Sequence, residues 1–430
     1  MPEEIVKVVE TIIGRLKEDR EKFGSAATGY IGKHIVGTGE DAHLTTKVYI
    51  DLLRPHVILC CGKRGSGKSY SIAVLLEEML QLEKKYAEKI AAVVFDPMGI
   101  YWSMKKPNEI QKKLLAEWKL EPKGFGDKIN VFVPAELKSA YENAGIPVDH
   151  ALTISAREFS PDDWILAFNL ERTSEFAVGL IRNVNALLES GEDFDVNDII
   201  ERISRDNKLT DHTKNVLIGF FELAKGWGIL AKKGMTIHDI VKAGQIAVID
   251  LSRVKGEEWG LRNLIAAWIT RQVYRERLIS RKEEEVAKLT GEQIKQSFPL
   301  TWLVFEEAHN FIPSDRETVS SEAIKIIAKQ GREPGVGLIV ISQMPGKIHQ
   351  DILSQCDIVI SFRLTSRDDL RALHAVYQSY MPEELEKAIN TLPRHMIGSA
   401  IILDDVLEKV FSVNIRPRLS WHSGGTAIIT

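Results

Sequence analysis

Residues 56–74, HVILCCGKRGSGKSYSIAV, join a short apolar run to a helical pattern through a loop rich in glycine and cationic side chains. The run 57–61 has the length and apolar character of a buried strand, and the apolar residues after the loop recur at helical spacing. Glycines let backbone N–H groups converge on an anion, and the start of the following helix adds positive potential. A strand, loop and helix of this kind are suited to a polyphosphate.

The loop matches G-x-x-x-x-G-K-[ST], the P-loop pattern. Lys68 would reach the β- and γ-phosphates of ATP, and the Ser69 hydroxyl would complete the shell of a Mg²⁺ ion. A glycine-rich turn without a ligand is the alternative, but the flanking strand and helix favour a nucleotide site. The residues predicted to bind the nucleotide are Gly62, Lys63, Arg64, Gly65, Ser66, Gly67, Lys68, Ser69 and Tyr70.

Composition limits the remaining possibilities. With 430 residues the chain exceeds the usual size of one domain, and its net charge of −4 excludes a globally basic nucleic-acid binder. Contact with nucleic acid would then come from local clusters of cationic side chains or from a channel that such side chains line. The three cysteines form no disulfide or zinc pattern. The sequence has no run of about 20 apolar residues and no signal-peptide core, so we expect a cytoplasmic protein without a membrane segment.

Apolar, β-branched runs alternate with helical patterns along most of the chain. This order is typical of an α/β fold with a mostly parallel sheet flanked by helices. The predicted strands are 56–61, 91–96, 130–134, 151–155, 245–251, 301–307, 337–342, 357–364 and 399–403.

Three segments depart from this alternation. The first 23 residues have the pattern of an amphipathic helix. Residues 160–233 contain helical patterns and no convincing strand, so we predict a helical subdomain inserted into the sheet domain. The charged stretch 281–296 is expected to continue a helix from about residue 258 and to end in an exposed loop.

A P-loop ATPase also needs an acid on a neighbouring strand, and the stretch TWLVFEE supplies two. Glu306 would contact the Mg²⁺ ion through water, and Glu307 would polarise the attacking water. The alternative is that both acids cap the next helix. Paired acids favour hydrolysis of ATP over a GTPase switch.

Two further residues flank the predicted strand 337–342. Gln343 follows it and could sense the γ-phosphate or orient water, unless it makes only an ordinary strand-end hydrogen bond. Arg332 precedes the strand, so it should lie at the opposite edge of the sheet and reach a neighbouring subunit's nucleotide. The alternative for Arg332 is a surface side chain paired with Glu333.

From about residue 48 to the C-terminus, the sequence resembles the HerA–FtsK superfamily, and its HerA branch in particular. The resemblance rests on GKRGSGKS, VVFDPMGIY, GQIAVIDLS, LVFEEAHNFIP, GREPGVGLIVISQMP, ILSQCDIVISFRLTSRDD and IRPRLSWHSGG, in this order and spacing. It departs from the family in three places. Ile100 stands where an acid is usual, and Met344 stands where an arginine is usual. The β-barrel that usually precedes the P-loop is expected here as a short remnant at most.

The resemblance implies a RecA-like ATPase that uses ATP and Mg²⁺, assembles as a hexameric ring and moves double-stranded DNA through a central pore. In the family, the positions of Glu306, Glu307, Gln343 and Arg332 are functional. A partner nuclease or another effector in DNA end processing or defence is expected. The alternatives are a packaging or conjugation pump of the same superfamily, and an ATP-binding ring that organises a partner enzyme.

The predicted division of the chain has five parts. They are an N-terminal helix with a short β remnant (1–50), the first part of the ATPase core (51–159), the helical insertion (160–233), the second part of the core (234–415) and a C-terminal arm (416–430).

Overall fold

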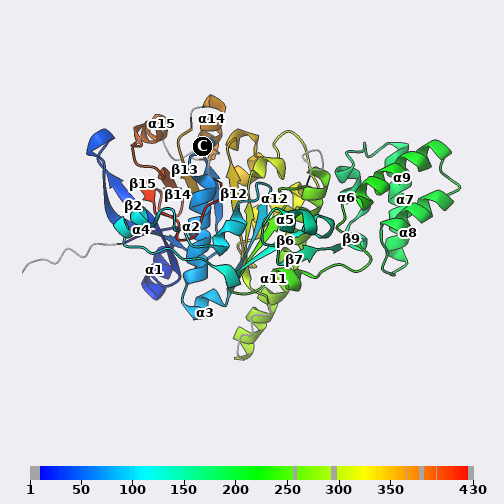
Figure 1. Cartoon of the computed structure of the whole chain (residues 1–430), viewed down its shortest axis with the longest axis horizontal. Helices are drawn as coiled ribbons and strands as arrows, with labels where there is room; N and C mark the ends of the chain where they lie inside the picture. Colours follow the sequence, from blue (N-terminus) through cyan, green and yellow to red (C-terminus); the bar gives the residue numbers. More distant parts are fainter. Residues whose placement is uncertain are drawn as a thin grey trace, which may run out of the picture.

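The structure is a computed structural model that describes residues 10–254, 259–291, 298–364, 366–376, 382–393 and 395–424. Within these ranges a 13-stranded sheet crosses the molecule, and helices cover both of its faces (Figure 1). The strand order is β1-β3-β2-β15-β14-β13-β4-β12-β11-β5-β10-β6-β7, and β8 pairs separately with β9.

The strands are β1 (Thr11–Ile13), β2 (Thr28–Val36), β3 (His43–Asp51), β4 (Val57–Cys61), β5 (Ile90–Asp96), β6 (Ile129–Pro134), β7 (His150–Leu152), β8 (Ile154–Ser155), β9 (Leu230–Ala231), β10 (Ile246–Asp250), β11 (Leu300–Phe305), β12 (Val336–Ser342), β13 (Ile358–Ser361), β14 (Ser399–Asp404) and β15 (Lys409–Ile415). The α-helices are α1 (Lys17–Phe23), α2 (Lys68–Gln81), α3 (Lys84–Ala87), α4 (Lys112–Glu117), α5 (Lys138–Asn143), α6 (Pro161–Ala167), α7 (Glu175–Glu189), α8 (Val196–Arg205), α9 (Asp211–Lys225), α10 (Ile237–Ile240), α11 (Trp259–Thr290), α12 (Ser321–Gln330), α13 (Gln350–Leu353), α14 (Arg367–Val376) and α15 (Pro382–Thr391).

The sheet is mostly parallel, as the α/β prediction requires. All ladders from β13 through β4, β12, β11, β5, β10 and β6 to β7 are parallel, whereas β14, β15, β2 and β3 extend the sheet in antiparallel pairs. The register places Leu59, Val340, Phe305, Phe95 and Ile249 in one row across five neighbouring strands. Because the central strands run parallel, their carboxyl ends meet at one edge.

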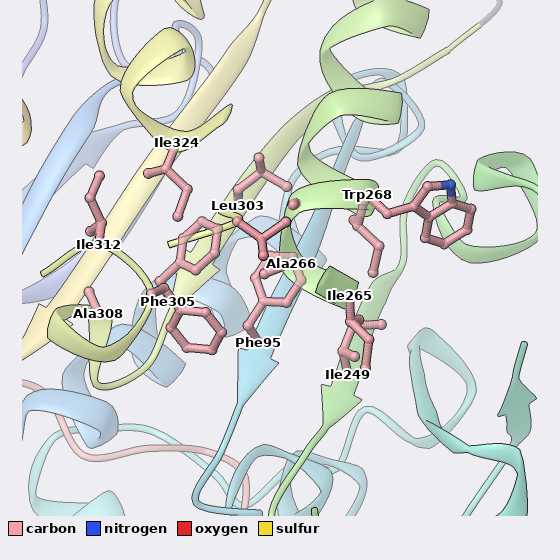
Figure 2. Packing of buried hydrophobic residues seen from close by; sticks show 14 of the residues in the cluster. Phe95, Ile249, Ile265, Ala266, Trp268, Leu303, Phe305, Ala308, Ile312 and Ile324 are labelled. Carbon is pink, nitrogen blue, oxygen red and sulfur yellow. The ribbon is translucent and has the colours of Figure 1, made fainter. Parts of the chain in front are cut away.

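One face of the sheet packs against α11 and α12. Figure 2 shows Phe95, Phe305 and Ile249 from the strands facing Ile265 and Ile324 from these two helices. The rings of Phe95 and Phe305 stack with their centroids 4.5 Å apart. This closely packed apolar layer fixes β5 and β11 relative to each other. It therefore also fixes the points at which the loops after these strands begin.

The opposite face packs against α2, the helix that follows the glycine-rich loop. Ile72, Leu75, Leu76 and Met79 are buried there against the strands. Strands such as β5 and β12 are buried along their whole length, as expected for strands covered on both faces.

The helices α6 to α9 lie between β8 and β9 in the chain and stand at the right of Figure 1, away from β2. Asp163 of α6 accepts two hydrogen bonds from the Arg271 guanidinium of α11, at 2.8 and 3.0 Å. This pair ties the helical segment to the sheet domain. The expectation of no strand in 160–233 is wrong at Leu230–Ala231, where two residues pair with β8.

The predicted N-terminal helix is also wrong in part. Residues 1–9 lie outside the described ranges, Thr11–Ile13 form a strand parallel to β3, and only Lys17–Phe23 are helical. A buried ion pair between Arg15 and Asp51, 2.6 Å long, fixes this segment against the sheet. The predicted strand 151–155 is divided into β7 and β8, which join different sheets.

The helix expected from residue 258 is confirmed as α11, which is 32 residues long and carries many charges in its second half. In the described part of the chain, no helix combines the length and the apolar character needed to cross a bilayer.

Candidate functional site

The candidate site lies where the carboxyl ends of β4, β12 and β11 meet, because β12 pairs with both other strands. The glycine-rich loop follows β4, Gln343 follows β12, and Glu306 and Glu307 follow β11. The sheet therefore brings Glu306, Glu307 and Gln343 beside a loop that lies more than 200 residues earlier in the chain. The carboxyl ends of neighbouring parallel strands meet in this way.

The loop between β4 and α2 needs its glycines. Gly65 and Gly67 have φ values of +73° and +104°, in the left-handed region that favours glycine. A Cβ atom on Gly62 would lie 2.6 Å from the Cβ of Phe362, so this position tolerates no side chain. The backbone is thereby free to form the cradle that a phosphate group requires.

Lys68, the first residue of α2, is buried with 6% of its surface exposed. Its Nζ atom donates hydrogen bonds to the carbonyl oxygens of Gly62 and Lys63, both at 3.0 Å. The Ser66 Oγ atom is buried and has no hydrogen-bond partner among the described residues. A polyphosphate fits this loop, because its oxygens would accept from both Lys68 and Ser66.

Glu306 is held by two hydroxyl groups. Ser69 Oγ donates to its Oε1 atom and Tyr101 OH donates to its Oε2 atom, both at 2.8 Å. Burial raises the pKa of Glu306 to about 7, an effect that the hydrogen bonds from Ser69 and Tyr101 partly offset and the charge of Glu307 reinforces. Glu306 is therefore poised to lose its proton when a cation arrives.

Ser69 and Glu306, the two residues predicted to hold Mg²⁺, are thus direct neighbours. The described residues contain no group of three or more acidic, histidine or cysteine side chains that could hold a metal by themselves. One hydroxyl and one carboxylate fit Mg²⁺, which usually takes few protein ligands and completes its shell with phosphate oxygens and water.

Glu307 follows directly and has a left-handed backbone, with φ 51° and ψ 49°. The amide nitrogen of Gln343 donates a hydrogen bond to Glu307 Oε1. Glu307 Oε2 accepts no hydrogen bond from a described residue, although it lies 3.4 Å from His309 Nδ1. A strained backbone that carries a buried carboxylate with one free oxygen is suited to a catalytic base.

His309 contacts the end of β12 as well. Its Nδ1 atom lies 3.1 Å from Ser342 Oγ. Burial lowers the pKa of His309, so the ring is neutral near pH 7 and can accept or donate a proton. Gln343 therefore positions Glu307 through a hydrogen bond, and His309 lies beside the second oxygen of the carboxylate.

These residues line an open cleft of about 500 Å³. The loop lines it through residues 64–70, and Glu306, Glu307 and Gln343 line it as well. The volume is in the usual range for a small-molecule site.

Arg332 lies elsewhere, in the turn between α12 and β12 and at the amino-terminal edge of the sheet. It lines a second hollow with Arg54, Pro55 and Leu300, which precede or begin other strands. The side chain is exposed and makes no hydrogen bond or ion pair with a described residue, Glu333 included. Its location at the opposite edge agrees with the position expected from the sequence.

Two parts of the site were not predicted. Tyr101 lies in the stretch VVFDPMGIY, but its contact with Glu306 depends on the adjacent positions of β5 and β11. The carboxylate of Asp96, in the same stretch, accepts hydrogen bonds from the backbone N–H groups of residues 98–101 and so shapes this turn. The segment after β15 also lines the cleft, through Pro417, His422 and Gly424.

Comparison with known proteins agrees with this geometry. A family model described as "Helicase HerA, central domain" matches residues 30–273. A "DNA double-strand break repair helicase HerA" of Sulfolobus acidocaldarius is 27% identical over 401 residues, which cover 92% of this chain and 70% of that protein. The protein of the same description from Sulfurisphaera tokodaii is 26% identical over 401 residues, covering 93% and 71%.

Solved structures share the fold. VirB4 of Thermoanaerobacter pseudethanolicus superposes with a TM-score of 0.54 at 12% identity, covering 90% of this chain and 97% of that one. The bacterial conjugative coupling protein TrwB superposes with a TM-score of 0.52 at 12% identity, covering 91% and 94%. The fold is that of RecA-like P-loop ATPases, and the chain belongs to the HerA helicase family, whose central domain it contains at residues 30–273.

Proposed function

We propose that the protein is an ATP-dependent translocase of double-stranded DNA that works as a hexameric ring. The observation that carries the proposal is the position of Glu307. Its carboxylate lies in the cleft of the glycine-rich loop, and Gln343 binds one of its oxygens. The other oxygen accepts no hydrogen bond from the part of the chain that the structure describes. An ATPase needs such a base beside the phosphate cradle to activate water.

The roles of the other residues follow from their places in the cleft. Lys68 exchanges its carbonyl contacts for the β- and γ-phosphates, and Ser69 and Glu306 hold the Mg²⁺ shell. When bound, Mg²⁺ neutralises charge on the phosphates. Gln343 contacts Glu307 and begins the loop after β12, so it is placed to relay the state of the nucleotide to that loop.

The ring is proposed from Arg332. A cation at the amino-terminal edge of the sheet is far from its own nucleotide, but a head-to-tail ring would bring it to the next subunit's site. The exposure of Arg332 and its lack of a partner among the described residues support this role. Arginines supplied in trans contribute roughly 10³–10⁵ to the rate of phosphoryl transfer.

Duplex DNA is proposed as the substrate because the relatives are described as DNA double-strand break repair helicases. With a net charge of −4, the chain would bind DNA through local cationic groups along a pore. A nuclease or another effector is the proposed protein partner. An ATP-binding ring that only organises such a partner would bind ATP without movement along DNA.

The test is ATP hydrolysis by the purified full chain with and without duplex DNA, together with particle mass in solution. We expect hydrolysis that DNA stimulates, in a particle of six subunits, and no hydrolysis by Lys68→Ala. DNA binding should fall at least about tenfold between roughly 50 and 200 mM salt, since phosphate contacts release counterions. If an assembled ring hydrolysed ATP at the same rate with and without DNA, the result would favour a ring that only organises a partner enzyme.

A further inference from the structure

The strands β2 and β3 carry two lysines that the candidate site does not explain. Lys33 and Lys47 are directly opposite each other in the antiparallel ladder, so both side chains extend from the same face of the sheet. Val48 and Ile50 of β3 point to the other face and are buried there. Like charges in opposite positions destabilise a sheet. A ligand of opposite charge would offset this repulsion.

The described acids do not neutralise the pair. Neither lysine makes a hydrogen bond or an ion pair through its ammonium group with a described residue, and Lys47 is exposed while Lys33 is half-buried. Two acids lie near this face of the sheet. Glu78 is paired with Arg416 at 2.6 Å, and Glu10 is exposed just before β1. Both positive charges are therefore open to an anion from solution.

Aromatic rings hold the two ammonium groups in place. Lys33 Nζ lies 4.8 Å from the centroid of the Trp118 ring. Lys47 Nζ lies 5.0 Å from the centroid of the Tyr30 ring, and the Tyr49 ring follows at 5.7 Å from that of Tyr30. We call these five residues the lysine face. A ring orders a lysine without removing its charge, so less side-chain entropy is lost when an anion binds.

The lysine face adjoins the cleft of the glycine-rich loop in the same chain. Trp118, which contacts Lys33, also lines this cleft. Asn414 of β15 lines it too and is the strand partner of Lys33. β2 and α4 lie together at the left of Figure 1, outside the parallel strands whose carboxyl ends form the candidate site. An anion bound to Lys33 is therefore one side chain away from the cleft.

We propose that the lysine face binds the phosphate backbone of duplex DNA and connects it to the nucleotide cleft through Trp118. The inference rests on the proposed function, which gives the protein DNA as its substrate. Phosphates follow one another along a DNA strand at an axial spacing of about 3.4 Å. Two lysines that lie side by side can therefore each contact a different phosphate group.

The lysine face is suited to the DNA backbone and not to the bases. Aromatic residues that bind bases offer an open ring for stacking, whereas an ammonium group lies over the rings of Trp118 and Tyr30 here. A lysine acts as a point charge, and its contact with a phosphate carries no sequence information. Binding at this face is thus independent of DNA sequence, as movement along DNA requires.

Acetylation of the wild-type full chain with acetic anhydride, followed by mass spectrometry of its peptides, tests the location. Lys33 and Lys47 should react in the absence of DNA and lose most of this reactivity when duplex DNA is bound. Lys84 and Lys85, which are exposed on α3, should react equally in both states. Protection of Lys33 and Lys47 by ATP and Mg²⁺ alone would overturn the inference, and so would unreactive lysines in an assembled ring without DNA.

The salt dependence of DNA binding counts the contacts. Each phosphate contact contributes about 0.9 to the slope of log affinity against log salt concentration. The double variant Lys33→Ala, Lys47→Ala should therefore flatten this slope by about 1.8 and weaken the binding of two unrelated duplex sequences equally. Lys33→Arg, Lys47→Arg keeps both charges and should keep the slope. Lys84→Ala, Lys85→Ala is the matched control, because it removes two charges from another surface and should not change the slope.

The outcomes separate this inference from the proposed function. If the wild type bound duplex DNA and Lys33→Ala, Lys47→Ala left the slope unchanged, the lysine face would be excluded as a DNA site, while the proposed function would stand. A variant that lost only the binding of a protein partner would identify a protein interface and equally overturn the inference. If the wild type bound no duplex DNA, the proposed function itself would fall.

Discussion

Gln343 donates a hydrogen bond to Glu307 across the adjacent ends of β12 and β11. The bond occupies one oxygen of the carboxylate and leaves the second free for water. It also connects the predicted base to the strand that lies between it and the glycine-rich loop.

Glu307→Gln should bind ATP with near wild-type affinity and hydrolyse it about 10²–10⁴ times more slowly, because the amide keeps the shape of the side chain and cannot take a proton. Single-turnover hydrolysis and equilibrium ATP binding, measured on the same preparation, test this. Gln343→Ala removes the orienting bond and keeps the base, so it should give a smaller loss. Wild-type turnover by Glu307→Gln would assign the base to another residue.

Glu306 should make the stability of the protein without nucleotide depend on pH. The pKa of Glu306 is raised from the ordinary 4.5 to about 7. Its favourable contribution to the free energy of unfolding is therefore complete below about pH 4.5 and is lost as the pH rises to 7. Glu306→Gln stays neutral and avoids this loss. The variant should therefore gain stability relative to the wild type between pH 5 and pH 8, by a few kcal/mol at most.

Urea unfolding of the variant and the wild type at pH 5 and pH 8 measures this difference in the free energy of unfolding. The other titrating groups are the same in both proteins, so their contributions cancel. A gap between variant and wild type that stays constant with pH would contradict the buried position of Glu306. The same variant should also lose Mg²⁺-dependent hydrolysis.

Arg416 and Glu77 form a fully buried ion pair with an N–O distance of 2.9 Å, which ties the segment after β15 to α2. Arg416→Ala takes the nearer cation from the buried Glu77 carboxylate, which keeps Arg418 at 3.9 Å, and it also removes the partner of Glu78. It should lower the free energy of unfolding by about 3–5 kcal/mol. Urea unfolding measures the change. Lys84→Ala is the control, because it removes an exposed pair with Glu88 and should have no measurable effect. A similar small effect in both variants would mean that the pair does not anchor this segment.

Arg332→Ala should bind ATP and assemble, yet hydrolyse ATP at least about a hundredfold more slowly. Mixed rings of Arg332→Ala and Lys68→Ala subunits should recover part of the activity, because some interfaces then combine an intact lysine with an intact arginine. Turnover of the mixtures, with subunit exchange shown by mass measurement, tests the assignment. Full activity of Arg332→Ala alone, or inactive mixtures that do exchange subunits, would exclude a role in trans.

Sequence patterns predicted those parts of the site whose residues directly follow an apolar strand. The glycine-rich loop, Glu306 with Glu307, and Gln343 each follow an apolar strand directly, and the rules of a parallel sheet bring these strand ends together. The same rule placed Arg332 at the opposite edge. Each of these inferences needs only a motif and its neighbouring strand.

The sequence did not predict features that depend on distant partners. Thr11–Ile13 have an apolar pattern that suits a helix. The segment nevertheless forms a strand, because it pairs with β3 and because the buried ion pair of Arg15 with Asp51 fixes it there. β15 pairs with β2 across more than 370 residues, which no local pattern reveals. The cleft depends on the same long-range pairing, since Ile415 of β15 is one of the residues that line it.

Displacement of the third strand from a DNA triplex tests the proposed coupling of ATP hydrolysis to movement along duplex DNA most directly. We predict displacement by the wild type with ATP and Mg²⁺, and none with ADP or by Glu307→Gln at equal DNA occupancy. Failure of an assembled wild-type ring to displace the strand while it hydrolyses ATP would contradict the account.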